Sequence, residues 1–469
     1  MKVLLVSPNI ETLPDPVFPI GMACISAALK EKRIPVQMLD LCFSSDYEAD
    51  ITTTLGAYDP DVIGISLRNV DNVSYPQYIS YLPFYRKIVD LIRKQCSAVI
   101  VVGGSGFTLL PEAILNFLEA DYGVAGEGES SFVGLVADLE ASRAPEKRIL
   151  HPGLEATDLD ALPFADREGI DGLAYQTKGG MGNIQTKRGC PFTCIYCTYP
   201  LIEGKRVRMR DPDKICDEME QLSAEGIRNL FIVDNEFNFP PEHALAVCRR
   251  MAARKIRMRW GCYANPAFIT DELVSAMKAC GCTGLEFGCD SAHPQVLKNL
   301  GKNFSVEDML SAASVCRGHK LPFCISLLLG GPGETMQTVR QTLETVRDMN
   351  PTAVICMAGV RIFPQTRMYH IALEEGVIDA GTDFLKPVFY LSPDVQDTIM
   401  PFLAEFALEN PTWIFPGLQI NINENLQKKL RRFGIRGPLW EYMKMGSRLR
   451  GRCWCRNKGA RGTAVNSEW

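Results

Sequence analysis

Short runs of β-branched and other apolar residues alternate with amphipathic stretches through the first part of this chain. The runs fall at 3–6, 36–39, 62–67, 98–102 and 122–125. Apolar runs of strand length, separated by segments of helix length, are typical of a parallel sheet covered by helices on both faces. The pattern therefore predicts an α/β domain over residues 1–140, with the flavodoxin-like arrangement of a Rossmann-type sheet.

The same alternation resumes later and continues over residues 181–372. Six apolar runs, each followed by an amphipathic stretch, lie at 183–186, 230–233, 258–263, 284–288, 323–329 and 354–362. Six βα units predict a partial (β/α)6 barrel of TIM type, in which reactive groups lie on the loops that follow the strands.

Two further segments flank this barrel. Residues 141–180 are polar and contain Pro145, Pro152 and Pro163, so they are interpreted as a linker. Residues 373–469 are expected to form a small helical region, because amphipathic pieces occur near 402–408 and 427–433.

Three cysteines directly follow the first barrel strand. Cys190, Cys194 and Cys197 lie in the run CPFTCIYC. Three thiolates on one loop suit three irons of a 4Fe-4S cubane, and the fourth iron is then free to bind the amino and carboxylate groups of S-adenosylmethionine. A chance cluster and a zinc knuckle are the alternatives, but no second Cys-x2-Cys or His-x3-His pair follows within fifty residues.

Polar residues also follow the second strand of the predicted barrel. Asp234, Asn235 and Glu236 occupy this position. Carboxylate and amide oxygens there are suited to hold the ammonium group of a bound amino acid through charge-assisted hydrogen bonds. The alternative is that the acidic residues cap the following helix.

The ends of the fourth and fifth strands carry similar features. Glu286 and Ser291 flank Gly288, and a carboxylate at this place suits ribose hydroxyls while the glycine lets the backbone approach a ligand. Gly330, in a Gly-Gly-Pro-Gly run, is expected to border an adenine ring.

The cysteine run, with the aromatic Tyr196 before its last cysteine, resembles the signature of the radical S-adenosylmethionine superfamily. The resemblance extends over residues 182–372. In that family the corresponding strand ends bind the methionine amino group, the ribose and the adenine. The family's glycine-rich turn after the second strand is replaced here by Asp234-Asn-Glu236.

Glycine-rich loops follow the fourth and fifth strands of the first domain. They do not form a dinucleotide fingerprint, because the G-x-G-x-x-G pattern fails at Leu109. A tight turn without a ligand is the alternative. Their placement resembles the cobalamin-binding domains that are fused to radical S-adenosylmethionine barrels, which implies that cobalamin contacts come from Gly103, Gly104, Ser105, Thr108, Gly126 and Glu127.

The first domain supplies no histidine to coordinate cobalt, because all five histidines lie beyond residue 150. Arg68 and Asn69 follow its third strand in a loop similar to that of the tryptophan C-methylases. That resemblance implies that the Arg68 guanidinium faces the lower side of cobalt without donating a lone pair. An ordinary ion pair between Arg68 and Asp71 is the alternative.

The resemblance implies a cobalamin-dependent enzyme that methylates a carbon of a small-molecule, lipid or natural-product substrate. It implies two equivalents of S-adenosylmethionine per turnover and a flavodoxin- or ferredoxin-type electron donor. Cyclisation or rearrangement of a substrate, and a non-catalytic cobalamin carrier, are the alternatives. A methylthiotransferase fits less well, because residues 1–140 hold only Cys24, Cys42 and Cys96.

Composition limits the setting. Seventeen cysteines and a first segment that is typical of a strand indicate a reducing, cytoplasmic location. The net charge of −5 predicts no nucleic-acid partner. From Lys428 onward twelve Lys and Arg face two Glu, and Cys453 and Cys455 lie in this tail, so either a solvated tail or a peripheral contact with an anionic membrane is expected.

Overall fold

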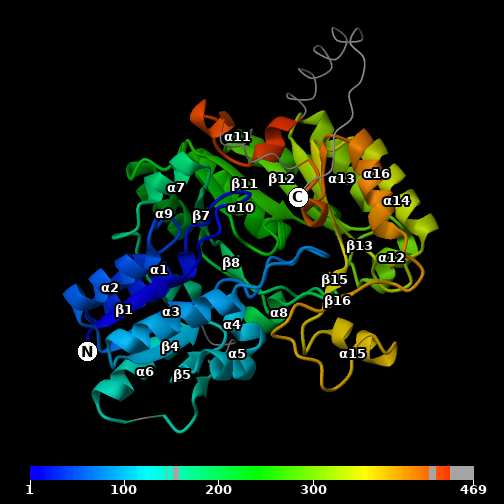
Figure 1. Cartoon of the computed structure of the whole chain (residues 1–469). Coiled ribbons are helices and arrows are strands. Elements are labelled where there is room, and N and C mark those ends of the chain that lie inside the picture. Colours follow the sequence, from blue (N-terminus) through cyan, green and yellow to red (C-terminus); the bar gives the residue numbers. More distant parts are fainter. Residues whose placement is uncertain (144, 152–157, 422–428, 444–469) are drawn as a thin grey trace, which may run out of the picture.

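Two parallel sheets, each covered by helices, make up the body of the molecule in the computed structural model (Figure 1). The structure describes residues 1–143, 145–151, 158–421 and 429–443. Each sheet corresponds to one of the two stretches of alternating pattern, so the predicted α/β class is confirmed.

The first sheet has the strand order β2-β1-β3-β4-β5-β6 and is entirely parallel. Helices α2, α3 and α5 cover one face, and α1 and α6 cover the other. The order reverses between β1 and β3, which is the flavodoxin-like switch point where ligands bind at the carboxyl ends of strands. The strands are β1 (Val3–Ser7), β2 (Val36–Asp40), β3 (Val62–Ser66), β4 (Val99–Gly103), β5 (Tyr122–Val124) and β6 (Ile149–Leu150); the helices are α1 (Ile20–Glu31), α2 (Tyr47–Tyr58), α3 (Leu82–Gln95), α4 (Ser105–Leu109), α5 (Pro111–Leu118) and α6 (Glu129–Glu140).

The segment interpreted as a linker is more ordered than expected. Its residues Ile149 and Leu150 form β6 and extend the first sheet by pairing with β5. Further along, α7 (Gly172–Lys178) begins after Asp171, whose side chain accepts a hydrogen bond from the Ala174 amide. A strand of two residues is too short to produce a periodic pattern, so β6 could not be predicted from the pattern of apolar residues.

The second sheet is also parallel, with the order β17-β14-β13-β12-β11-β10-β7. Its first six strands in the chain are the predicted ones, and the partial barrel is confirmed. The seventh, β17, comes from the region predicted to be helical, where Trp413 pairs with Val354. The strands are β7 (Gly182–Ile184), β10 (Asn229–Ile232), β11 (Arg259–Ala264), β12 (Cys282–Asp290), β13 (Phe323–Leu329), β14 (Ala353–Ala358) and β17 (Trp413–Ile414); the covering helices are α9 (Pro212–Ala224), α10 (Pro241–Ala253), α11 (Asp271–Ala279), α12 (Pro294–Asn299), α13 (Val306–Gly318) and α14 (Met336–Met349).

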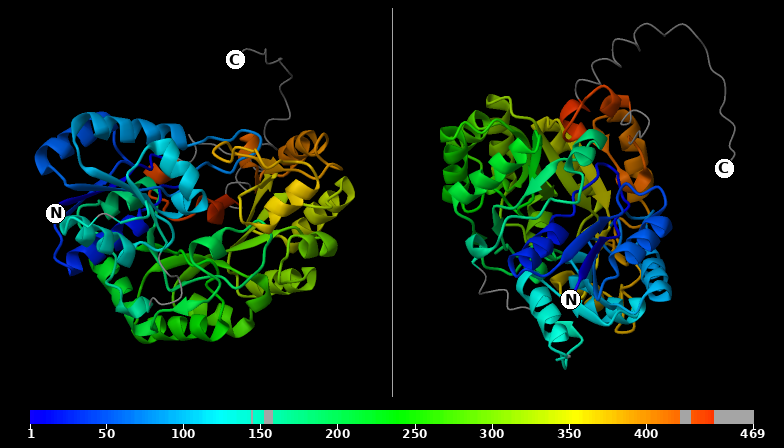
Figure 2. Two further views of the ribbon diagram at one scale, coloured as in Figure 1. Left: turned by 90° about the horizontal axis from the view of Figure 1, so that it is seen from below. Right: turned by 90° about the vertical axis from the view of Figure 1, so that its left-hand side faces the viewer.

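Side chains alternate between the two faces of this second sheet. On β12, Leu285 and Phe287 belong to the core beneath the helices, whereas Glu286 and Gly288 lie on the opposite face. We call this opposite face, which also carries Phe231 and Tyr263, the inner face. The left view of Figure 2 places the helices outside the curve of the sheet, with the first domain and the C-terminal segment on the other side.

The C-terminal region adds α15 (Arg367–Glu374), the hairpin β15 (Val360–Arg361) with β16 (Phe389–Tyr390), and α16 (Ile399–Glu409). The helix expected near 402–408 is α16. A short 3-10 helix, η4 (Leu439–Tyr442), ends the described chain. The basic tail with Cys453 and Cys455, and part of the piece expected at 427–433, lie outside the described residues. None of the described helices is long and apolar enough to cross a bilayer.

Candidate functional site

The cysteine loop is closed at its base by two short antiparallel strands, β8 (Lys187–Arg188) and β9 (Arg208–Met209). The Cys190 amide donates to the Gly204 carbonyl at 3.1 Å. Gly189 has φ +95, and a Cβ there would lie 2.1 Å from the Arg206 carbonyl oxygen. Only glycine fits this close approach, so the base of the loop is fixed just before its first cysteine.

The far side of the loop is fixed by Ile195, between the second and third cysteines. Its amide donates to the Leu300 carbonyl at 3.0 Å, and its carbonyl accepts from the Met368 amide at 2.9 Å. The side chain is 2% exposed and packs in an apolar cluster with these two residues. The loop therefore has two anchors, and Cys194 and Cys197 lie on either side of the second.

The three thiols differ in exposure, but burial shifts the pKa of each in the same direction. Cys190 is buried, and Cys194 and Cys197 are partly exposed. Burial raises the pKa of Cys190 to about 11 and that of Cys197 to about 12, and it also raises the pKa of Cys194. Among the described residues, no group of three or more His, Cys, Asp or Glu is arranged to hold a single metal ion. Three cysteines shared among the irons of a cubane is the ligand set that fits this loop.

The residues that follow β10 divide into two groups. Asp234 is fully buried and accepts hydrogen bonds from the Thr186 amide at 2.6 Å, the Thr186 hydroxyl at 2.5 Å and the Lys187 amide at 3.2 Å. Its carboxylate thus ties β10 to the strand that leads into the cysteine loop. By contrast, Asn235 Oδ1 and Glu236 Oε2 are buried without a hydrogen-bond partner. Burial raises the pKa of Glu236 to about 7.

Buried polar atoms are normally hydrogen-bonded. The two unpaired oxygens therefore indicate that a ligand with a hydrogen-bond donor binds here. Asn235 and Glu236 therefore fit a donor such as an ammonium group, and Glu236 acts electrostatically on Cys190 and Cys194. Asp234 is in a different position, since its oxygens already have protein partners.

A buried polar cluster lies at the carboxyl end of β12. Lys302 Nζ lies 2.6 Å from Asp290, 2.8 Å from the Gly288 carbonyl and 3.2 Å from the Tyr196 hydroxyl, and Tyr196 donates to Asp290. Gly288 is exposed, and a Cβ there would meet no atom within 4 Å, so open space lies above it. Ser291 is fully buried and its hydroxyl lies 3.0 Å from that of Thr342.

Glu286 lies on the inner face, but its side chain is directed along the sheet toward the C-terminal segment. Its Oε1 accepts a hydrogen bond from the Trp440 indole at 2.8 Å. At the end of β13, Gly330 has φ +89, and its amide donates to the buried Glu334 at 2.5 Å. The strand-end turn that includes Gly330 is thus held by a carboxylate from within the same loop.

The glycine-rich loop of the first domain is held by hydrogen bonds to the loops that follow the two neighbouring strands. Gly104 has φ +95, and a Cβ there would lie 2.6 Å from the Leu67 carbonyl oxygen. The Ser105 hydroxyl donates to the Arg68 carbonyl at 2.7 Å. Thr108 accepts from the Gly126 amide at 2.8 Å. These contacts join the loops that follow β3, β4 and β5 at one edge of the sheet, next to Gly103 at the end of β4.

Arg68 extends from this edge as an exposed side chain. Its proposed ion-pair partner, Asp71, is instead bound to Arg361 at 2.9 Å. No described residue makes a hydrogen bond or ion pair with the Arg68 guanidinium, whose charge acts on Tyr199 and Tyr263 of the second domain. Its neighbour Asn69 accepts from the Tyr85 hydroxyl through its backbone carbonyl at 3.0 Å. The interpretation of Arg68 as an ordinary Asp71 partner is therefore wrong.

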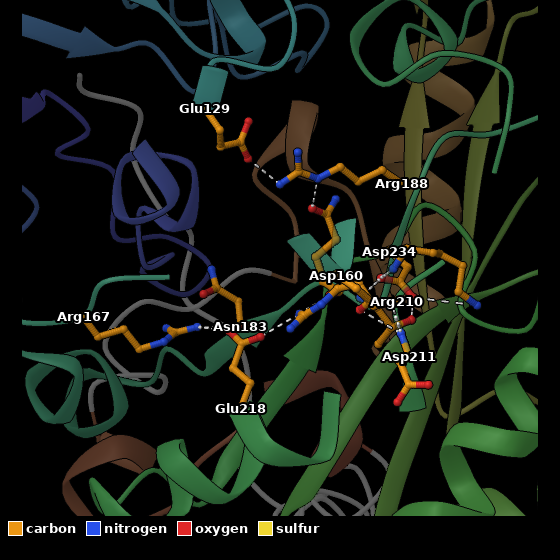
Figure 3. A network of polar contacts seen from close by, with 12 residues as sticks. Glu129, Asp160, Arg167, Asn183, Arg188, Arg210, Asp211, Glu218 and Asp234 are labelled. Carbon is orange, nitrogen blue, oxygen red and sulfur yellow. Dashed lines mark hydrogen bonds and ion pairs between the residues drawn. The ribbon is translucent and has the colours of Figure 1, made fainter. Parts of the chain in front are cut away.

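Glu127 has a different environment from the one expected for a cofactor contact. Its two carboxylate oxygens accept hydrogen bonds from Arg208, one of them at 2.9 Å, and Arg188 lies 3.2 Å away. Arg188 also binds Glu129 at 2.6 Å (Figure 3). These four residues, which we call the interdomain ion network, join the loop after β5 to the base of the cysteine loop.

Sequence reasoning missed several residues of this site. Lys302 and Asp290 form the cluster beside Tyr196, and Glu203 accepts from Asn235 at 2.7 Å and from the Gly189 amide at 3.1 Å. No motif or regular spacing in the sequence predicts these residues as part of the site, because Lys302 and Glu203 reach it from loops between strands. Arg188 lies two residues before Cys190, and no partner was predicted for it.

Two family models match the chain. Residues 184–346 match the Radical SAM superfamily, and residues 6–136 match the B12 binding domain. The tryptophan 2-C-methyltransferase of Streptomyces laurentii is 25% identical over 437 residues, which cover 77% of this chain and 73% of that protein. The cytidylyl-2-hydroxyethylphosphonate methyltransferase of Streptomyces wedmorensis is 26% identical, covering 90% of this chain and 93% of that protein.

A solved structure with the same fold is that of the radical S-adenosylmethionine methyltransferase TsrM from Kitasatospora setae, with cobalamin and a 4Fe-4S cluster bound. The two structures superpose with a TM-score of 0.84 at 24% sequence identity. The match covers 97% of this chain and 100% of that chain. The likeness shows that the two proteins share one fold, with the same two sheets and covering helices.

Proposed function

The chain belongs to the radical S-adenosylmethionine superfamily and carries a B12-binding domain, and from this we propose that it methylates a carbon atom of a small-molecule substrate. One observation carries the proposal beyond the family match. Helix α4, in the glycine-rich loop of the first domain, packs against α8 (Tyr199–Ile202), which begins two residues after Cys197. The glycine-rich loop, which would bind cobalamin, and the cysteine loop, which would bind the cluster, are thus close neighbours.

When bound, the cluster with S-adenosylmethionine and the cobalamin supply the radical and methyl-transfer chemistry. The residues of this chain bind the cofactors and orient them. Cys190, Cys194 and Cys197 would hold the cluster. Asn235 and Glu236, with their unpaired oxygens, would bind the ammonium group of S-adenosylmethionine.

The open space above Gly288 supports a ribose there, near Tyr196, whereas Ser291, predicted as a contact, is fully buried and its hydroxyl lies against Thr342. The turn at Gly330 would border the adenine. The cobalamin would lie on the loop of Gly103, Gly104, Ser105 and Thr108, near Gly126 and Asn69. Arg68, which has no partner among the described residues, would face the cobalt and exclude water or a ligand from its lower side.

We also place the enzyme in the cytoplasm, with a flavodoxin- or ferredoxin-type protein as its electron donor. The cysteines that the structure describes are all free thiols, in agreement with a reducing compartment.

The proposal is tested with the full chain, reconstituted anaerobically with iron, sulfide and cobalamin. On reduction with S-adenosylmethionine that carries a deuterated methyl group, we expect deuterated methylcobalamin, measured by mass spectrometry. Cleavage of S-adenosylmethionine without methylcobalamin would favour a cyclase or rearrangement enzyme instead. Binding of cobalamin without iron incorporation would favour a non-catalytic carrier.

A further inference from the structure

Glu286 lies beside an aromatic wall on the inner face of the second sheet. Tyr263 on β11 is its direct partner in the strand register. Tyr263 is 42% exposed, and its ring packs edge-on against Phe231 of β10 at 5.0 Å between centroids. A large aromatic side chain in the middle of a domain that keeps this much exposure has a free face, so a ligand has access to it.

The C-terminal segment fixes the position of the Glu286 carboxylate from below. Trp440 donates its indole N–H to Oε1, and its ring lies against Gly284, where an added Cβ would be 2.7 Å away. Trp440 is 7% exposed and packs on Cys324 and Ala353. One oxygen of the Glu286 carboxylate is therefore bound by the protein, and the other oxygen is available to a ligand.

The next residue anchors this segment to the sheet. Glu441 accepts from the Thr283 hydroxyl at 3.0 Å and lies 3.4 Å from Arg259. The position of the indole beside Glu286 is thus fixed by the fold, because the next residue in the chain is bonded to both β11 and β12.

The charges near Glu286 leave it without a counter-ion. Asp15 and Glu441 both act on it and both are acidic, and each has its own partner, Arg431 and Arg259 respectively. The groups that face Glu286 are Trp440, Tyr263, Cys324, Asp15 and Glu441. No cation among the described residues pairs with its second oxygen. Burial raises the pKa of Glu286 to about 7, although the Trp440 bond lowers it.

We propose that Glu286 and Tyr263 form a substrate site that takes a protonated amino group attached to an aromatic or apolar body. This inference rests on the proposed function, since it names the class of molecule that the enzyme methylates. It replaces the prediction that Glu286 binds ribose. A carboxylate without a counter-ion forms a strong charge-assisted bond with an ammonium group, and the exposed face of Tyr263 attracts the same cation.

Neutral donors fit this site less well than cations. A hydroxyl would leave the charge of Glu286 uncompensated in a largely buried place, whereas an ammonium group would neutralise it. Binding should therefore strengthen as pH rises through about 7, where Glu286 ionises, as long as the ligand amine stays protonated.

The test compares benzylamine with benzyl alcohol as probes of the reconstituted full-length enzyme, by titration followed with ligand-observed NMR at millimolar concentration. We expect benzylamine to bind about tenfold more tightly than benzyl alcohol, and Glu286→Gln to remove about that factor. Glu344→Gln, an exposed carboxylate on the outer helix α14, is the matched control and should change nothing.

A second variant covers the case in which Glu286→Gln fails to fold. Trp440→Phe keeps an aromatic ring on Gly284 but removes the donor that lowers the Glu286 pKa, so the pH midpoint of benzylamine binding should move upward. Equal binding of the two probes, no binding of benzylamine, or a midpoint that does not move in Trp440→Phe would overturn the inference. These outcomes are separate from methylcobalamin formation, which tests the proposed function alone.

Discussion

The Arg188 guanidinium lies 2.6 Å from the Glu129 carboxylate and thereby joins the base of the cysteine loop to the start of α6 in the first domain (Figure 3). Arg188 stands two residues before Cys190, and Glu129 begins α6 directly after the loop of Gly126. Burial alone would raise the pKa of Glu129, but Arg188, together with a backbone hydrogen bond and the charge of Arg208, outweighs burial and keeps this pKa below its ordinary value. The pair is thus ionised and sets the position of the cysteine loop relative to the first domain.

Arg188→Gln should destabilise the protein, because it leaves Glu129 as a buried charge without its main partner. The expected loss is about 3 kcal/mol in the free energy of unfolding, measured as a lower denaturant midpoint. The matched control is Arg143→Gln, which breaks an exposed pair with Asp138 and should cost less than about 1 kcal/mol. Equal midpoints for the two variants would contradict the role of the interdomain pair.

The alternating pattern predicted the two sheets well, because each buried strand of three or more residues lies in its own apolar run. It missed β6 and β17, which have two residues each and depend on a neighbouring strand for their pairing. The cysteine loop was predictable from spacing alone. Arg188 with Glu129, and Trp440 with Glu286, were not, since residues 59 and 154 positions apart meet only through the tertiary fold.

Substitution of a loop cysteine should remove the cluster without unfolding the first domain. For Cys194→Ala we expect iron and sulfide to fall well below the about four irons per chain of the parent enzyme, while cobalamin binding is retained. Cys96→Ala is the control, because this thiol ends α3 of the first domain and is only half-buried. Full iron content in Cys194→Ala would show that the loop is not the cluster site.

Arg68 provides a spectroscopic test of the cobalamin face. Because residues 1–140 contain no histidine, the parent enzyme should bind cobalamin without an imidazole from this domain below the cobalt. Arg68→His places a ligand on the same exposed loop position, so the electron paramagnetic resonance spectrum of its cob(II)alamin should show nitrogen coupling. Arg68→Gln should not. An unchanged spectrum in Arg68→His would mean that this side chain does not reach the cobalt.

Two glycines of the first domain allow a matched comparison. Gly104→Ala should destabilise the protein by about 1–3 kcal/mol and weaken cobalamin binding, because φ is +95 and the new Cβ would press on Leu67. Gly134→Ala lies within α6 with no atom within 4 Å of the new Cβ, so it should be neutral or stabilise by up to about 1 kcal/mol. Thermal unfolding and cobalamin titration of both variants check this contrast.

Glu334 should make stability depend on pH in a direction opposite to that of a salt-bridged carboxylate. It is fully buried, its Oε2 accepts from the Gly330 and Gly331 amides, and its Oε1 has no partner. Burial raises its pKa to about 7, so the folded state binds this proton more tightly than the unfolded state does. The resulting stabilisation is complete below the ordinary pKa near 4.5 and is lost as pH rises through about 7.

Comparison with Glu334→Gln isolates this contribution from those of other buried carboxyls such as Glu236. The amide oxygen of the variant can still accept from both glycine amides, but it does not ionise. Between about pH 5 and about pH 8 the parent should therefore lose about 3 kcal/mol more of its free energy of unfolding than the variant does. Denaturant titrations of both proteins at the two pH values measure this difference. Parallel curves would mean that Glu334 titrates near its ordinary pKa and that the turn around Gly330 carries a charged carboxylate at neutral pH.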